Sequence, residues 1–236
     1  GTRDAAANWS EEYTGRLRDM GFTVGTASPC VFYHPQRGLR AYVHGDDFVV
    51  VGMPKELKWM QTKIEEKYAL TVEVLGPDEG QCPEVRVLNR ILRWTQQGVE
   101  YEADPRHVEI MLKQLNIADC KAVVTPGTKE EGHAKPGDVA ASGMDERLDD
   151  DRHSIYRALV ARANYLSQDR GDIKFAVKEL SRRMAKPRHR DVEALKRLAR
   201  YLSGKPRMVT TFKRQEKHNG IVGWSDSDWA GCAETR

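Results

Sequence analysis

The spacing of apolar residues changes about halfway along the chain, and this change limits which folds the chain can adopt. Up to about residue 125, short apolar runs typical of β-strands alternate with stretches that have the 3.6-residue period of a helix. From residue 152 to residue 204 only the helical period is present, in three successive stripes. Interleaved strands and helices indicate an α+β or α/β class. We therefore predict an α+β fold whose second part is helical.

In the first part, proline and turn residues mark where the elements begin. Pro54 predicts the first turn of a helix, because proline lacks the N–H that a helix leaves unpaired there. Asp104 followed by Pro105 predicts the start of another helix. Two hairpins are predicted, from runs 39–43 and 48–51 and from runs 85–94 and 99–103. The remaining predictions are a helix over 4–20 that ends at Gly21, and strands over 30–33 and 70–75.

The second part contains three amphipathic helices. Their apolar stripes are Tyr156, Leu159, Val160, Ala163 and Leu166; Ile173, Ala176, Val177, Leu180 and Met184; and Val192, Leu195, Ala199 and Leu202. Gly204 is predicted to end the third helix as the residue just past its last turn. On the second helix, Lys174, Lys178 and Arg182 recur every four residues and so share the outward face. A final stretch, 221–229, has strand character.

Charge is unevenly distributed along a chain whose net charge is only +3. Residues 152–218 hold nineteen Lys and Arg against six Asp and Glu, an excess typical of surfaces that attract phosphate backbones. A solvated basic face without a partner is equally compatible with this count. Residues 128–151 hold three basic and eight acidic residues, and the stretch from Thr125 has few large apolar ones, which predicts a flexible linker.

Composition excludes several classes of protein. With 39% hydrophobic and 31% charged residues, a 236-residue chain can bury a core and is neither wholly disordered nor membrane-spanning. Its longest uncharged apolar run, 48–51, is too short to cross a bilayer, and no secretory signal opens the chain. The four cysteines are scattered without CxxC spacing, which predicts idle thiols in a reducing compartment. The first residue is not Met, so we expect a fragment or a processed piece.

Two neighbouring carboxylates, Asp46 and Asp47, occupy the turn of the first predicted hairpin. Asp in a turn commonly bonds its own backbone, and that is the simpler interpretation of the pair taken alone. The functional alternative is a site for divalent metal, because phosphoryl transfer by two Mg²⁺ ions requires hard oxygen ligands. Neighbouring strand residues point to opposite faces, so a turn is where both carboxylates can approach one site. A third carboxylate is expected from elsewhere.

Several short motifs occur in a fixed order along the chain. They are residues 1–9 (G-T-R-D-A-A-A-N-W), 21–22 with 27–32 (G-F and A-S-P-C-V-F), 42–48 (Y-V-H-G-D-D-F), 125–127 (T-P-G), 156–160 with 165–166 and 170–173 (Y-R-A-L-V, Y-L and R-G-D-I), 180–182, 194–197 and 200–204 (L-S-R, A-L-K-R and R-Y-L-S-G), and 223–231 (G-W-S-D-S-D-W-A-G). In this order the chain resembles the reverse transcriptase of copia-type LTR-retrotransposon Pol polyproteins, in which residues 42–48 match the Y-V-D-D box.

The resemblance implies a domain order. Residues 1–125 would form a partial reverse transcriptase palm, a βαβ-type sheet with helices, and 126–151 the flexible linker. Residues 152–218 would form a basic helical thumb and connection region, and 219–236 the first strand or strands of an RNase H-like domain.

The resemblance also implies a set of site residues and ligands. Asp46 and Asp47 would bind Mg²⁺ or Mn²⁺ for nucleotidyl transfer, and Asp226 would be the first metal-binding carboxylate of RNase H; the less favoured alternative for Asp226 is an ordinary surface Asp. Nucleotide and primer contacts would come from Arg3, Asp4, His44, Gly45, Asn89 and Arg90, with strand 85–94 in the primer-grip hairpin. Backbone contacts would come from Lys174, Lys178, Arg182, Arg183, Arg190, Lys196, Arg197 and Arg200. The implied partners are an RNA or DNA template–primer duplex, deoxynucleoside triphosphates and an upstream polymerase segment, inside the cell in a cytoplasmic particle or the nucleus.

The chain departs from the family pattern at several positions. Asp4 and Ala6 replace Gln and Pro, His44 and Gly45 replace Tyr and Val of the polymerase box, and Gly171 replaces Pro. The family's upstream metal-binding Asp would precede residue 1, and the remaining RNase H carboxylates would follow residue 236. We therefore expect the isolated chain to be inactive as an RNA-directed DNA polymerase and as RNase H. Two alternatives stay open: a non-catalytic nucleic-acid-binding remnant that uses the basic helices, and an inert globular remnant.

Overall fold

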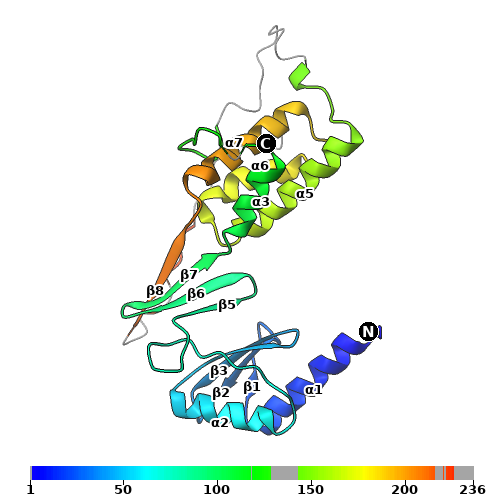
Figure 1. Ribbon diagram of the computed structural model, residues 1–236. Helices are drawn as coiled ribbons and strands as arrows, with labels where there is room; N and C mark the ends of the chain where they lie inside the picture. The colour runs from blue at the N-terminus through cyan, green and yellow to red at the C-terminus, as the bar shows by residue number, and fades with distance from the viewer. Residues whose placement is uncertain (1, 118, 129–142, 216–219, 221, 226–236) are drawn as a thin grey trace. The chain divides into compact units, whose positions relative to one another are not determined.

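The computed structural model describes residues 2–117, 119–128, 143–215, 220 and 222–225 (Figure 1). The chain divides into two compact units, Gly1–Val74 and Leu75–Arg236, each with its own hydrophobic core. Both units combine antiparallel strands with helices, so the predicted α+β class is confirmed. The division between them falls inside segment 1–125. In the described residues, no helix has the length and apolar character needed to span a bilayer.

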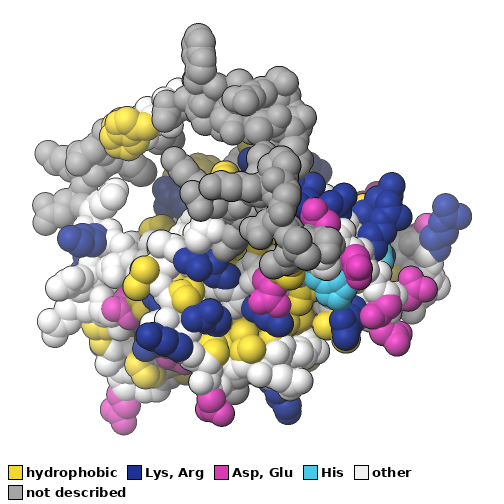
Figure 2. All heavy atoms as spheres, turned by 90° about the horizontal axis from the view of Figure 1, so that it is seen from above, with side chains coloured by type: hydrophobic (Ala, Val, Ile, Leu, Met, Phe, Trp, Pro, Cys, Tyr) yellow, Lys and Arg dark blue, Asp and Glu magenta, His cyan; other side chains and the backbone are white. Residues whose placement is uncertain are grey.

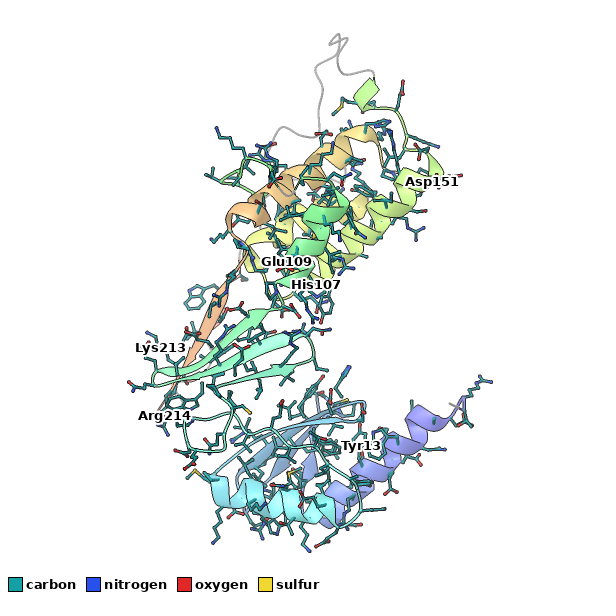
Figure 3. All side chains as sticks on the ribbon, viewed as in Figure 1. Tyr13, His107, Glu109, Asp151, Lys213 and Arg214 are labelled. Carbon is teal, nitrogen blue, oxygen red and sulfur yellow. The ribbon has the colours of Figure 1, made fainter. Side chains whose placement is uncertain are left out.

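The first unit is a four-stranded antiparallel sheet with helices on one face. Its elements are α1 (Ala5–Asp19), β1 (Thr23–Val24), β2 (Val31–His34), β3 (Leu39–His44), β4 (Asp47–Val51) and α2 (Pro54–Glu65), with strand order β1-β2-β3-β4. Tyr13 of α1 points to the sheet, where its ring meets those of Phe32 and Phe48 edge-on (Figure 3). Met60 and Ile64 of α2 complete the core. The opposite face of the sheet exposes Val31, Tyr33, Tyr42 and Val51.

Most of the elements predicted for the first unit are confirmed. The 4–20 helix, the hairpin with its turn between residues 44 and 47, and the helix that begins at Pro54 are all present. Gly21 follows α1 with a φ of +94°, and a Cβ there would lie 3.1 Å from His34 Nε2, so both the backbone and the packing require glycine. The strand predicted over 70–75 was wrong: its apolar residues Leu70, Val72 and Val74 are exposed, and only Leu75 forms an isolated bridge, with Cys82.

The second unit joins a four-stranded antiparallel sheet to a group of helices. The strands are β5 (Glu84–Val87), β6 (Arg90–Thr95), β7 (Gly98–Ala103) and β8 (Val209–Lys213), in that order. The helices are α3 (Arg106–Gln114), α5 (Asp150–Ser167), the 3₁₀ turn η1 (Gly171–Ile173), α6 (Lys174–Arg182) and α7 (His189–Gly204). Their core contains nearly all of the three predicted apolar stripes, from Tyr156 to Leu202. Asp104 Oδ1 accepts the Arg106 N–H at the start of α3, which agrees with its predicted capping role.

Three predictions for the second unit need correction, and one strand was missed. The single strand predicted over 85–94 is two strands, because Leu88 and Asn89 take φ values of +47° and +60° and turn the chain between β5 and β6. Strand β8, which pairs with β7, was not predicted. Gly204 is the last residue of α7 rather than a left-handed cap. Glycine is needed there because Ala122 packs close to it: a Cβ on Gly204 would lie 2.6 Å from the Ala122 Cβ. Of the strand predicted over 221–229, the described residues 222–225 are not in a strand.

The R-G-D-I motif, residues 170–173, lies between α5 and α6 and begins with a buried arginine. Arg170 is 1% exposed, and its guanidinium donates from Nε and Nη2 to the two carboxylate oxygens of Asp172, at 2.9 and 2.8 Å. The same guanidinium donates to the carbonyls of Lys205 and Pro206, just after α7. Tyr201 of α7 donates its hydroxyl to Asp172 Oδ2 at 2.8 Å. The motif therefore fastens the α5–α6 connection to the end of α7.

Candidate functional site

The tip of the β3–β4 hairpin carries the two carboxylates singled out by the sequence. His44 pairs with Asp47, which leaves Gly45 and Asp46 as a two-residue turn. Gly45 has a φ of +62°, whereas Asp46 has no positive φ, and this combination is that of a type II′ turn. Such a turn requires a positive φ at its first central residue, where glycine is unstrained and a β-branched residue is strained. Gly45 is therefore unstrained at the tip.

Helix α1 is attached to this tip through a tryptophan. The Trp9 indole Nε1 donates to the Gly45 carbonyl at 2.6 Å, and its ring packs edge-on against Tyr13 and Tyr68. The backbone of the turn is thereby held by a side chain from another element. Arg3 and Asp4 are exposed at the beginning of α1, five to six residues before Trp9. The first unit thus contains six of the predicted site residues: Arg3, Asp4, His44, Gly45, Asp46 and Asp47.

The electrostatic surroundings of the pair leave both carboxylates open. Asp46 and Asp47 are exposed, and neither forms an ion pair or a side-chain hydrogen bond with another residue in the described ranges. By strand alternation Asp47 shares the open face of the sheet with His44. The His44 ring stacks on Tyr42, with centroids 6.4 Å apart, and its Nδ1 lies 3.4 Å from the Tyr42 hydroxyl.

Two of the requirements for a divalent metal are met at the tip, and one is not. The pair offers hard oxygen donors, and both are accessible, which suits Mg²⁺ or Mn²⁺. However, within the described residues no group of three or more His, Cys, Asp and Glu side chains is placed to hold a metal ion. Asp46 and Asp47 could therefore supply part, but not all, of a coordination shell.

Asn89 and Arg90 lie in the second unit, at the β5–β6 turn. Asn89 is exposed, but the Arg90 guanidinium is largely used inside the unit. Its Nε lies 3.0 Å from the Tyr101 hydroxyl and 3.2 Å from Asp169 Oδ1, and its Nη1 reaches the Leu88 carbonyl and the Tyr165 hydroxyl. Burial alone would lower the pKa of Arg90, but the hydrogen bonds that Arg90 donates to Asp169 and Tyr101 outweigh burial and raise it. A primer contact by Arg90 is therefore restricted to its remaining Nη2.

The predicted backbone-binding residues divide into an open group and an engaged group. Lys174 and Lys178 are exposed on α6, although Lys178 also lies 3.6 Å from Glu179. The others contact neighbouring residues: Arg182 lies 3.4 Å from Glu179, Arg190 2.8 Å from Asp145, Lys196 2.7 Å from Glu193, Arg197 2.8 Å from Thr125 Oγ1 and Arg200 2.8 Å from the Lys121 carbonyl, while Arg183 is half-buried and also engaged. On the face drawn in Figure 2, Lys and Arg side chains alternate with acidic and hydrophobic ones. Asp226, the predicted RNase H ligand, lies outside the described residues.

Two features of the second unit were not found from the sequence. Phe175, next to Lys174, is 72% exposed, and its position outside the stripe of Ile173, Ala176 and Val177 was the available signal. Glu102 is 2% exposed and is bound by Arg93 at 2.6 Å and by Arg207 at 2.5 Å. These hydrogen bonds, the one from Arg207 above all, hold the pKa of Glu102 below its usual range. Sequence spacing carried no sign of this cluster, because Arg207 lies more than a hundred residues away.

Comparison with known proteins relates the chain to transposon polyproteins. No family model and no solved structure matches it. Retrovirus-related Pol polyproteins of Arabidopsis thaliana, from transposons RE1 and RE2, are 32% and 27% identical to it over 98% of its length. An uncharacterised mitochondrial protein of the same plant is 31% identical over 56% of the chain and 50% of its own length. The chain spans about 15% of each of the two polyproteins. Along nearly its whole length, the chain is similar to retrovirus-related Pol polyproteins of plant transposons.

Proposed function

We propose that the chain is part of an RNA-directed DNA polymerase, with Asp46 and Asp47 as the carboxylates that bind catalytic Mg²⁺. The observation that carries this proposal is the placement of two adjacent, unpaired carboxylates on the exposed tip of a hairpin, in the position of the polymerase box. Homology to Pol polyproteins over the whole chain supports it. On this proposal, unit Gly1–Val74 belongs to the palm, and the α5–α7 helices belong to the thumb and connection region.

The residues of this chain would divide the work of nucleotidyl transfer. Asp46 and Asp47 would hold the metal, whose chemistry is to stabilise the attacking and leaving oxygens of an in-line displacement. Arg3, Asp4, His44 and Gly45 would position the incoming nucleotide and the primer end, and Asn89 with the free Nη2 of Arg90 would contact the primer. Because the described residues hold no third carboxylate beside the pair, we propose that the chain does not turn over unaided.

Primer extension on an RNA template in Mg²⁺ tests this assignment. The 236-residue chain is tested alone and in a longer protein, in which an upstream polymerase segment of a related Pol polyprotein is fused to it, each alongside Asp46→Asn and Asp47→Asn variants. We expect product from the longer protein alone and none from either variant, since each substitution removes a metal-binding charge. Extension that persists in both variants would refute the assignment of these carboxylates, and extension by the 236-residue chain would refute the expected inactivity.

A second candidate function is nucleic-acid binding without catalysis. It is favoured by the incomplete ligand set at the hairpin tip together with the open Lys174 and Lys178 on α6. Phosphate contacts make affinity fall with salt, and the logarithmic slope decreases by about 0.7 to 0.9 for each contact removed. Binding to an RNA–DNA hybrid with a measurable salt slope, in a longer protein that extends no primer, would support this function over the first.

A further inference from the structure

The exposed ring of Phe175 lies on the basic face of α6. This nine-residue helix buries Val177 and Leu180 against the core of the second unit, and Ile173 is buried just before it. Phe175 lies on the other side with 72% of its surface exposed, and it forms no contact with another aromatic ring in the described part of the chain. Phe175 lies outside the buried stripe of this amphipathic helix, so its ring is accessible to a binding partner.

One lysine of α6 lies against this ring, and another precedes it directly in the sequence. The Lys178 ammonium lies 5.3 Å from the centroid of the Phe175 ring, and Lys174 precedes it in the sequence. Lys174 and Lys178 are one helical turn apart, a rise of about 6 Å. The acidic residue nearby is Glu179, which lies 3.6 Å from Lys178 and 3.4 Å from Arg182. Lys174 and Lys178, beside an accessible apolar ring, complement an anionic partner that also presents flat apolar faces.

We infer that Lys174, Phe175 and Lys178 form a binding site for single-stranded nucleic acid. Phe175 stacks on an unpaired base, and the two lysines contact the phosphates on either side of it. A duplex does not fit the ring in this way, because its base faces are already stacked on one another. The inference rests on the nucleic-acid-binding part of the proposed function, but it is independent of the metal site at Asp46 and Asp47.

Binding of fluorescently labelled twelve-nucleotide strands to the whole chain, followed by anisotropy, tests the site. Phe175→Ala is expected to weaken binding to a normal single strand about 5- to 150-fold, the range found when one base–aromatic stack is removed. Phe175→Trp is expected to retain binding. Lys174→Gln with Lys178→Gln is expected to lower the salt slope by about 1.4, whereas Phe175→Ala leaves the slope unchanged. Phe212→Ala is the matched control, because Phe212 is also exposed in this unit, on β8.

A strand of the same length that lacks bases separates base stacking from contacts with the sugar–phosphate backbone. On this abasic strand, Phe175→Ala and the unchanged chain are expected to bind equally. The inference is overturned if Phe175→Ala leaves binding to the normal strand unchanged. It is also overturned if the substitution weakens binding to the abasic strand, or to a blunt duplex, as much as it weakens binding to the normal single strand. Circular dichroism verifies that each variant is folded. Loss of primer extension in the Asp46 and Asp47 variants is measured separately, so a failure of this site and a failure of the proposed catalysis are distinguishable.

Discussion

Replacing Arg170 by Met tests the role of the R-G-D-I motif most severely. The substitution keeps the bulk of the side chain but removes the donors to Asp172, Lys205 and Pro206. Removing one partner of a buried ion pair costs about 3–5 kcal/mol. Here the largely buried Asp172 carboxylate keeps only its hydrogen bond from Tyr201, so we expect a loss toward the lower end of this range. For a unit of this size, that loss lowers the melting temperature by roughly 6 to 20 °C. Differential scanning calorimetry measures it directly. Arg157→Met is the control, because Arg157 is exposed on α5, the helix that precedes the motif. We expect it to change the free energy of unfolding by less than about 0.5 kcal/mol.

The dependence of this loss on pH provides a second readout. Burial alone would raise the pKa of Asp172, but hydrogen bonds from Arg170 and Tyr201 outweigh it and lower that pKa. Because its pKa is lower in the folded chain, the Asp172 carboxylate stabilises the fold at pH values above about 3.9, the pKa of Asp in an unfolded chain. This stabilisation is lost as the pH falls below that value. Without Arg170, burial raises the pKa of Asp172, so protonation in acid relieves part of the damage. The difference between Arg170→Met and the unchanged chain should therefore be smaller at about pH 4 than at about pH 7. An equal difference at both values, or none at either, would contradict the role given to the pair.

Two further predictions concern the hairpin turn and the carboxylate cluster of the second sheet. Gly45→Val, which restores the residue of the family pattern, should destabilise the first unit by about 1–3 kcal/mol in urea unfolding, because φ is +62° there, while Gly45→Asn should cost less; equal stability would contradict the type II′ turn. The pKa of Glu102 is lowered, mainly by the hydrogen bond from Arg207. The free energy of unfolding should therefore decrease as the pH is lowered from about 5 to about 3, and Glu102→Gln should make this decrease smaller. A slope unchanged by Glu102→Gln would show that the cluster does not control acid stability.

Hydrophobic periodicity was enough to predict the elements whose one face is buried. Helices α5 and α7 and strand β3 each pack one face against a hydrophobic core. Their apolar residues therefore recur with the period of the element, and the local pattern agrees with the tertiary structure. The pattern failed where exposure removes that agreement. Strand β8 is exposed along its length, so no alternation marks it. Residues 70–74 do alternate, but Leu70 and its apolar neighbours find no partner strand in the described residues.

Backbone conformation accounts for the other missed features. Leu88 takes a φ of +47°, which is uncommon for a residue other than glycine, so Asn89 is the one residue in the β5–β6 turn whose type indicates a turn.

For the candidate site, the sequence predicted the turn that carries Asp46 and Asp47. It could not predict that Arg90 is bound inside the second unit, because its partners Tyr165 and Asp169 lie more than seventy residues away, in and just after α5.

Paramagnetic Mn²⁺ tests the proposed metal site at the hairpin tip most directly. The Trp9 indole N–H is hydrogen-bonded to Gly45, next to Asp46, whereas Trp59 packs against His34 and Arg37 at the opposite end of β3, about 17 Å away along the strand. In a ¹H–¹⁵N spectrum, we predict that Mn²⁺ broadens the Trp9 indole signal strongly and spares that of Trp59. We also predict that Asp46→Asn with Asp47→Asn abolishes this difference. Equal broadening of both signals, or selective broadening of Trp9 that survives the double substitution, would contradict a metal site at these two carboxylates.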